Sequence, residues 1–289
     1  MITVNYKPTT TSNNSTNSTN RIIGKIQGAN KGPTLVFFAG IHGNETAGVI
    51  ALKKVFKTLI PEEINGTIYG IIGNLTALSA NQRYIDADLN RLWTKKQLQN
   101  LKSKKELNNE EEQQIELLEL LNQIINTHSG PFYFIDFHTT SSKTLPFITI
   151  NDALINRKFS SLFPVPIVLG IEEYLNGPLL SYINELGYVS LGFESGQHQE
   201  EEAIQNCISF IHLAMVFAKA IPMEKVIGFP IYYNQLKTNS NNISEIFEVV
   251  YLHRIQEKEN FKMKPDFKSF ENIYKKTELA TSNNKPVLS

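Results

Sequence analysis

The sequence lacks the means for an internal disulfide, a membrane span or an overall electrostatic field. It contains one cysteine, and no apolar run approaches the length that crosses a bilayer. The N-terminus shows no basic stretch followed by an apolar one. Lysine plus arginine and aspartate plus glutamate number 28 each, and no basic cluster is interleaved with aromatic residues. These features predict a cytoplasmic protein with no nucleic-acid partner and no membrane contact.

The chain is long and apolar enough to bury a sizeable core. It has 289 residues, of which 41% are hydrophobic. Its cysteine, Cys207, lies at helical spacing with Ile204, Ile208, Ile211 and Met215. We therefore interpret Cys207 as a core residue rather than a nucleophile.

From Arg21 onward, short apolar runs alternate with longer helical segments. Such runs are typical of strands buried on both faces, and their alternation with helices predicts an α/β fold with a central mixed, largely parallel sheet flanked by helices. Expected helices are Glu45–Leu59 and one after Asn109, for which Asn109 and Glu112 form a candidate capping box. The expected strands are Thr34–Phe38, Thr67–Ile72, Phe132–Phe137, Pro166–Leu169 and Tyr188–Phe193.

The chain is expected to divide into a main domain, residues 1–221, and a small C-terminal domain, residues 222–289. Residues 9–20 are polar throughout and are expected to be mobile, because they cannot bury enough apolar surface to offset the entropy of ordering them. After Ile221, the segments KVIGFPIYYN, EIFEVVYLHRI and ENFKMKPDF combine β-branched and aromatic residues with Gly, Pro and Asn breaks. This composition predicts a β-rich C-terminal domain.

Three residues that could bind a metal follow two of the expected strands. His42 and Glu45, in AGIHGNETAG, follow the run TLVFF, and His138 ends FYFIDFH. Because ligands gather beyond the carboxyl ends of strands in α/β sheets, the three side chains are expected to meet there. Two histidines and a carboxylate form a typical catalytic zinc set. The alternative for His138 is a hydrogen-bonded core histidine near a strand end. Asp136, two residues before His138, either fixes the tautomer of that imidazole or forms a plain structural ion pair.

The spacing His-x-x-Glu also occurs at His198 and Glu201, where it is less informative. That pair begins the charged run HQEEE at the start of a helix, so a solvated helix face is the favoured interpretation.

Two further polar segments follow strands. Asn81–Trp93 (NQRYIDADLNRLW) contains Arg83, Asn90 and Arg91, and an arginine fork suits a carboxylate, although a surface ion-pair loop is the alternative. Glu194 ends an apolar strand in GFESGQH. Partial desolvation there would raise its pKa toward the range of a proton shuttle, whereas most glutamates are merely solvated.

Together the motifs GIHGNETAG, NQRYIDADLNR, DFHTT and GFESGQH, in this order, resemble the aspartoacylase/succinylglutamate desuccinylase family of zinc carboxypeptidase-like hydrolases. The resemblance covers about residues 21–221. It implies a central mixed sheet, a smaller C-terminal β domain, and one zinc bound by His42, Glu45 and His138. The implied reaction is hydrolysis of the amide bond of an N-acyl amino acid, and the fold allows a homo-oligomer.

The resemblance also implies roles for the remaining residues. Arg83 would polarise the scissile carbonyl, Asn90 and Arg91 would hold a substrate carboxylate, and Glu194 would act as general base and then general acid. Aspartoacylases carry another arginine shortly before the glutamate motif, whereas GPLLSYINELGYVSLGFE contains none, so specificity for aspartate is not implied. Family members also supply a tyrosine from the C-terminal domain, and more β structure is expected after residue 289. The tyrosine candidates are Tyr232, Tyr233, Tyr251 and Tyr274.

Two other functions are compatible with the same residues. A metallocarboxypeptidase that removes the C-terminal residue of a peptide would use the same carboxylate clamp. A zinc-binding or ligand-binding protein without catalysis would need only the metal ligands.

Overall fold

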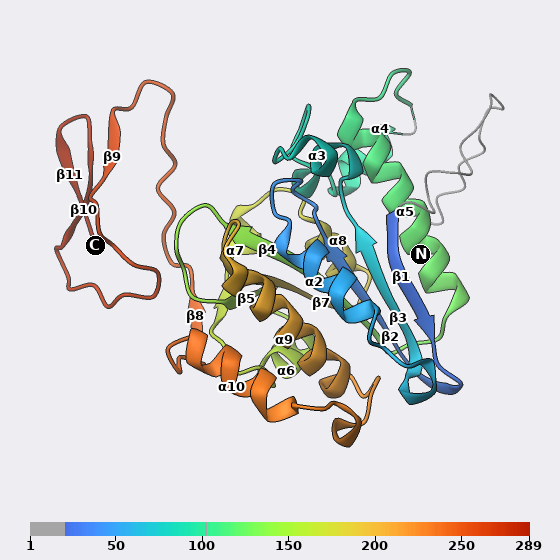
Figure 1. The fold of residues 1–289 in the computed structure, drawn as a ribbon. Coiled ribbons are helices and arrows are strands. Elements are labelled where there is room, and N and C mark those ends of the chain that lie inside the picture. The colour runs from blue at the N-terminus through green and yellow to red at the C-terminus, as the bar shows by residue number, and fades with distance from the viewer. Residues whose placement is uncertain (1–20, 102) are drawn as a thin grey trace.

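An eight-stranded mixed sheet forms the centre of the protein in the computed structural model, which describes residues 21–101 and 103–289 (Figure 1). The segment 9–20, expected to be mobile, lies outside the described residues. Neighbouring strands are parallel except for two pairs, β1 with β3 and β5 with β7. The predicted α/β class is confirmed. In order across the sheet the strands are β1 (Ile22–Gln27), β3 (Asn65–Ile72), β2 (Asn30–Ala39), β4 (Phe132–Thr140), β7 (Val189–Gln197), β5 (Phe147–Ile150), β6 (Ile167–Leu169) and β8 (Ile246–Glu248).

Helices cover both faces of this sheet. On one face α2 (Ala47–Phe56), α6 (Leu154–Ser160) and α9 (Glu201–Phe217) pack against the sheet, and on the other face α5 (Asn109–Thr127) and α8 (Leu179–Glu185) do so (Figure 1). The central strands are therefore buried on both sides, which explains why Leu35–Ala39 is apolar without alternation. All five strands expected from apolar runs are confirmed. The remaining helical segments are α3 (Leu75–Ala80), α4 (Lys95–Leu101), α7 (Ile171–Tyr174), α10 (Phe229–Asn239), η1 (Pro61–Glu63), η2 (Leu89–Arg91) and η3 (Met223–Lys225).

The capping box of α5 lies one residue earlier than the sequence suggested. Asn108 is the N-cap and accepts a hydrogen bond from the backbone N–H of Glu111, whose side chain accepts one from Asn108 N–H. The proposed pair Asn109 and Glu112 is wrong because Asn109 donates to Asp86 instead, through its backbone and its side chain.

Two elements beyond residue 221 attach to the main body. α10 packs on α9, with Tyr232 stacked on His212 at 4.3 Å between ring centroids, and β8 extends the sheet beside β6. The expected β character of KVIGFPIYYN is wrong, because Gly228 with φ +83° precedes Phe229, proline occupies the first turn, and the aromatic side chains pack on α9.

The end of the chain forms a separate antiparallel sheet, seen apart from the main body in Figure 1. Its strands are β9 (Phe261–Met263), β10 (Glu278–Ser282) and β11 (Lys285–Leu288). This confirms a small β sheet at the C-terminal end, whereas the boundary at residues 221 and 222 stays a prediction. None of the helices in the described part of the chain is both long and apolar enough to cross a bilayer.

Candidate metal centre and surrounding site

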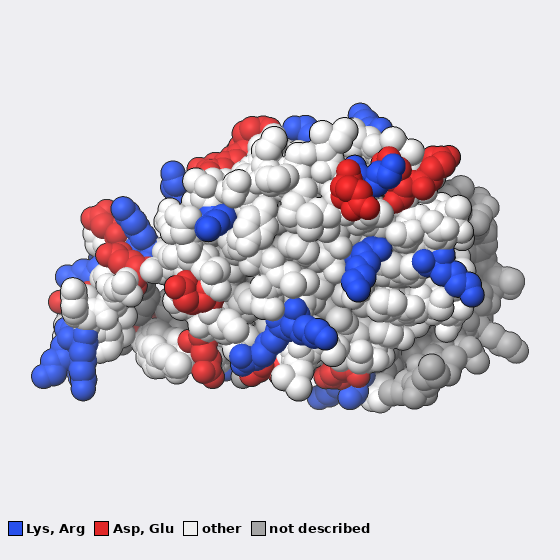
Figure 2. Space-filling model, turned by 90° about the horizontal axis from the view of Figure 1, so that it is seen from below, with Lys and Arg blue, Asp and Glu red and all other residues white. Residues whose placement is uncertain are grey.

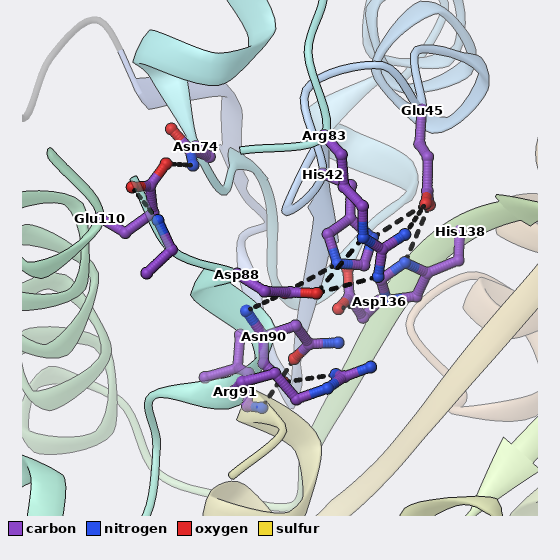
Figure 3. A network of polar contacts seen from close by, with 12 residues as sticks. His42, Glu45, Asn74, Arg83, Asp88, Asn90, Arg91, Glu110, Asp136 and His138 are labelled. Atoms are coloured by element: carbon purple, nitrogen blue, oxygen red, sulfur yellow. Dashed lines mark hydrogen bonds and ion pairs between the residues drawn. The ribbon is translucent and has the colours of Figure 1, made fainter. Parts of the chain in front are cut away.

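The three predicted metal ligands meet at one edge of the sheet. β2 and β4 are parallel neighbours in which Ala39 pairs with Phe137, so the turn after β2 and the end of β4 lie side by side. His42 Nδ1 lies 2.9 Å from Glu45 Oε1, and His138 Nδ1 lies 2.9 Å from Glu45 Oε2. The ligand atoms lie within 4.8 Å of one another, and all three residues are buried (Figure 3).

The donor set and its surroundings fit a zinc ion. Each imidazole turns Nδ1 toward Glu45, while its Nε2 faces a carboxylate, at 3.1 Å to Asp88 for His42 and at 2.8 Å to Asp136 for His138. A carboxylate that accepts the Nε2 proton leaves the Nδ1 lone pair available for a metal. The contact of Asp136 with His138 is compatible with both predicted roles, tautomer fixing and an ion pair. Asp88 makes the corresponding contact with His42, which the sequence did not indicate.

The charges of this cluster are tightly coupled. Burial alone would lower the pKa of His138, but Asp136 and Glu45 raise it well above its ordinary value. Burial would raise the pKa of Glu45, yet His138 and His42 lower it strongly. Both shifts have the same cause, the attraction between the imidazoles and the carboxylates that surround them.

Arg83 contacts this cluster from its solvent-exposed side. Its Nη2 atom donates to Asp88 Oδ2 at 3.0 Å, and its Nη1 atom lies 3.4 Å from Glu45 Oε1 (Figure 3). The side chain is 42% exposed, so the guanidinium is accessible to a molecule that enters the site. The position beside the metal ligands is compatible with the role that the resemblance implied.

Asn90 and Arg91 lie together on η2, next to the cluster. The side-chain oxygen of Asn90 accepts a hydrogen bond from Leu179 N–H at 2.9 Å, which orients the amide against the start of α8. Arg91 Nη1 donates to the backbone oxygen of Asn90 at 2.7 Å. In Figure 3 both side chains lie on the same side of Asp88.

Glu194 enters from the neighbouring strand. It pairs with His138 in the register of β4 and β7. Its side chain is partly exposed, yet Oε2 is buried and has no hydrogen-bond partner within the described residues. Burial raises the pKa of Glu194 to about 7. Such a carboxyl group can exchange a proton near neutral pH.

Of the predictions for Cys207 and His198, the structure confirms the first and contradicts the second. Cys207 is buried, and burial raises the pKa of its thiol to about 12, which confirms its place in the core. His198 does not lie on a solvated helix face. It is half-buried, and its Nδ1 atom lies 2.6 Å from Thr139 Oγ1, because the end of β7 carries it next to the end of β4.

The candidate tyrosines of the C-terminal region are found in two settings. Tyr232 and Tyr233 lie on α10 and pack against the main core. The side chains of Tyr251 and Tyr274 are exposed, and the Tyr251 hydroxyl lies 3.1 Å from His253 Nδ1. Assignment of a site tyrosine stays a prediction.

Charged side chains of both signs occur on the surface of the protein. On the face shown in Figure 2, basic and acidic side chains are interspersed among the described residues. This distribution agrees with the balanced composition. The absence of a nucleic-acid partner stays a prediction.

Comparison with known proteins yields matches in both sequence and fold. Residues 31–210 match the family model of the succinylglutamate desuccinylase/aspartoacylase catalytic domain. A probable aspartoacylase of Acaryochloris marina is 34% identical over 124 residues, which cover 42% of this chain and 40% of that protein. A succinylglutamate desuccinylase of Photorhabdus laumondii is 40% identical over 62 residues, which cover 21% of this chain and 19% of that protein. These matches thus span less than half the length of either relative.

A solved structure has a similar fold at low sequence identity. The product-bound ectoine utilization protein EutE (DoeB) of Ruegeria pomeroyi superimposes with a TM-score of 0.65 and 16% identity. The likeness covers 91% of this chain and 78% of that protein. It confirms the fold, including most of the chain beyond the match to the family model.

Proposed function

The chain belongs to the succinylglutamate desuccinylase/aspartoacylase family, and on that premise we propose that it is a zinc-dependent hydrolase of N-acyl amino acids. The observation that carries the proposal is the buried cluster of His42, Glu45 and His138, in which both Nδ1 atoms face the carboxylate. These three residues would hold one zinc ion per chain. When bound, zinc would supply Lewis-acid chemistry at this edge of the sheet.

Glu194 is the proposed proton carrier of the reaction. Its carboxylate accepts a proton from water as the water oxygen attacks the carbonyl carbon of the amide. It then returns that proton to the amine nitrogen as the carbon–nitrogen bond breaks, which releases a carboxylate and a free amino acid. A pKa near 7 suits both steps, because neither form of the carboxyl group is strongly favoured at neutral pH.

Arg83 and the η2 residues are proposed to bind the substrate. The guanidinium of Arg83, beside Glu45, would donate hydrogen bonds to the carbonyl oxygen as negative charge develops on it. Arg91 would bind the carboxylate of the amino acid through its planar fork, with Asn90 beside it. The substrate class is therefore a small N-acyl amino acid that carries a free carboxylate.

The test is a parallel screen of metal-free and zinc-loaded protein. A panel of N-acyl amino acids, including N-succinylglutamate and N-acetylaspartate, is compared with a panel of unmodified peptides, and released amine is measured. We expect zinc-dependent release from members of the first panel. Release from peptides alone would identify a carboxypeptidase. A protein with one zinc per chain that releases amine from neither panel would be a binding protein without catalysis.

A further inference from the structure

A buried glutamate accepts hydrogen bonds from the loop that carries Arg83, Asp88, Asn90 and Arg91. Glu110, in the first turn of α5, is 0% exposed. Its Oε1 atom accepts the backbone N–H of Ile85 at 2.7 Å. Its Oε2 atom accepts those of Asp86 at 2.9 Å and Ala87 at 3.0 Å. Three consecutive amides between the site residues thus converge on one carboxylate from another element. Figure 3 shows Glu110 beside Asn74.

The same carboxylate connects this loop to the turn that carries the metal ligands. Asn74 Nδ2 donates to Glu110 Oε1 at 3.0 Å, and the backbone N–H of Asn74 donates to the oxygen of Gly40 at 2.8 Å. Gly40 lies two residues before His42. The N–H of Gly43 also donates to the oxygen of Arg83 at 3.2 Å. One hydrogen-bond network therefore connects the two loops, and Asn74 and Glu110 are bonded to each other within it. We call this network the frame.

In this arrangement both side-chain oxygens of residue 110 must accept hydrogen bonds. Desolvation works to raise the pKa of Glu110, but the hydrogen bonds from Ile85, Asn74, Asp86 and Ala87 lower it. Glutamine would turn an NH2 group toward two of the four donors. Asn74 cannot rotate to accommodate it, because its side-chain oxygen already accepts Ala77 N–H at 3.0 Å.

We propose that Glu110 is a positioning residue, which holds the 85–87 backbone so that Asn90 and Arg91 face the substrate carboxylate and Asp88 meets His42. The proposal rests on the proposed function for the identity of that substrate. The frame itself consists of hydrogen bonds within the protein. Loosening it should weaken carboxylate binding more than it weakens the fold, because residues 83–88 of the loop are exposed or half-buried and contribute little to the core.

The experiment compares Glu110→Gln with Glu112→Gln. Glu112 lies in the same turn of α5 and is exposed, so this matched variant removes the same charge near the helix N-terminus without touching the loop. The first readout is hydrogen–deuterium exchange of residues 83–91, which requires no substrate. We expect exchange there to be about tenfold faster in Glu110→Gln alone, as loss of hydrogen bonds to a charged acceptor implies.

The second readout is the preference for an N-acyl amino acid over its methyl ester. We expect kcat/KM for the acid to fall about 10- to 100-fold in Glu110→Gln, mainly through KM, with a smaller fall for the ester. Glu112→Gln should keep both values. Glu110→Asp, which retains the charge on a shorter side chain, should recover part of the preference. It also serves as the second variant if Glu110→Gln does not fold.

The outcomes separate this proposal from the proposed function. If Glu110→Gln matches Glu112→Gln in both readouts, or if exchange rises evenly over the whole chain, Glu110 has no positioning role. If the zinc-loaded wild-type protein hydrolyses neither acid nor ester, the proposed function fails. A rise in exchange confined to residues 83–91 would then still support the frame, and its absence would overturn it.

Discussion

Replacing Glu194 by glutamine gives a pH-dependent change in stability that follows from the structure. Glutamine has nearly the same shape but cannot ionise. In the folded protein, burial raises the pKa of Glu194 from 4.5 to about 7, and Oε2 has no hydrogen-bond partner among the described residues. Each tenfold change in proton affinity corresponds to about 1.4 kcal/mol, so ionising this group costs the folded protein about 3 kcal/mol more than the unfolded chain.

The direction of the effect follows from the order of the two pKa values. Because the folded-state pKa lies above that of the unfolded chain, the contribution of Glu194 to stability is fully present below pH 4.5. It is lost as the pH rises through about 7. The stability of Glu194→Gln relative to the wild-type protein should therefore increase by about 2–3 kcal/mol between pH 5 and pH 8.

The assay is denaturant unfolding of chelator-treated protein at both pH values. Glu224→Gln, at an exposed position, is the control and should show no such change. In the zinc-loaded protein, Glu194→Gln should keep the metal while kcat falls by about 10²- to 10⁴-fold, because the proton carrier is gone. A stability difference that is equal at pH 5 and pH 8 would refute the reasoning from burial. Near-wild-type turnover with zinc bound would refute the role in proton transfer.

Three further predictions concern the proposed metal ligands, the carboxylate that contacts one of them, and the proposed substrate clamp. His138→Ala and His42→Ala should each abolish stoichiometric zinc, measured by atomic emission. The control is His128→Ala, which lies just before the first residue of β4 and should keep zinc. Unchanged zinc content in both ligand variants would exclude these ligands. Asp88→Asn should weaken zinc binding by about 10- to 100-fold in chelator competition, because the Nε2 proton of His42 loses its carboxylate partner, and equal affinity would show that this contact is dispensable. Arg91→Lys should lower kcat/KM for the acid by the equivalent of about 1–3 kcal/mol, because lysine lacks the bidentate fork. An enzyme that hydrolyses the acid and its methyl ester equally well, before and after the change, has no carboxylate clamp.

Features that depend on local pattern could be predicted from the sequence. The runs in β2, β3, β4, β6 and β7 are apolar because both faces of the sheet are covered. The three ligand-type residues could be brought together because the carboxyl ends of parallel strands share one edge.

Features that depend on distant partners could not be predicted. Asp88 and Glu110 belong to a charged loop and a charged helix, and nothing local separates them from solvated carboxylates. Their proposed roles rest on contacts with residues distant in the sequence, 46 residues away for His42 and 23 to 25 residues away for the loop amides. Likewise, α10 is a helix because α9 offers its aromatic residues a surface, although their β-branched and aromatic composition favours a strand.

The pairing of β2 with β4 has a consequence for how the protein folds. Glu45 and His138 are 93 residues apart, and they meet only when these two strands lie in register. The intervening chain contains β3 and α5, so the pairing is a non-local step whose loop-closure entropy opposes fast formation. The complete set of proposed metal ligands thus does not exist in a chain that has folded only locally. The time course of metal uptake during refolding would therefore measure when the centre of the sheet closes.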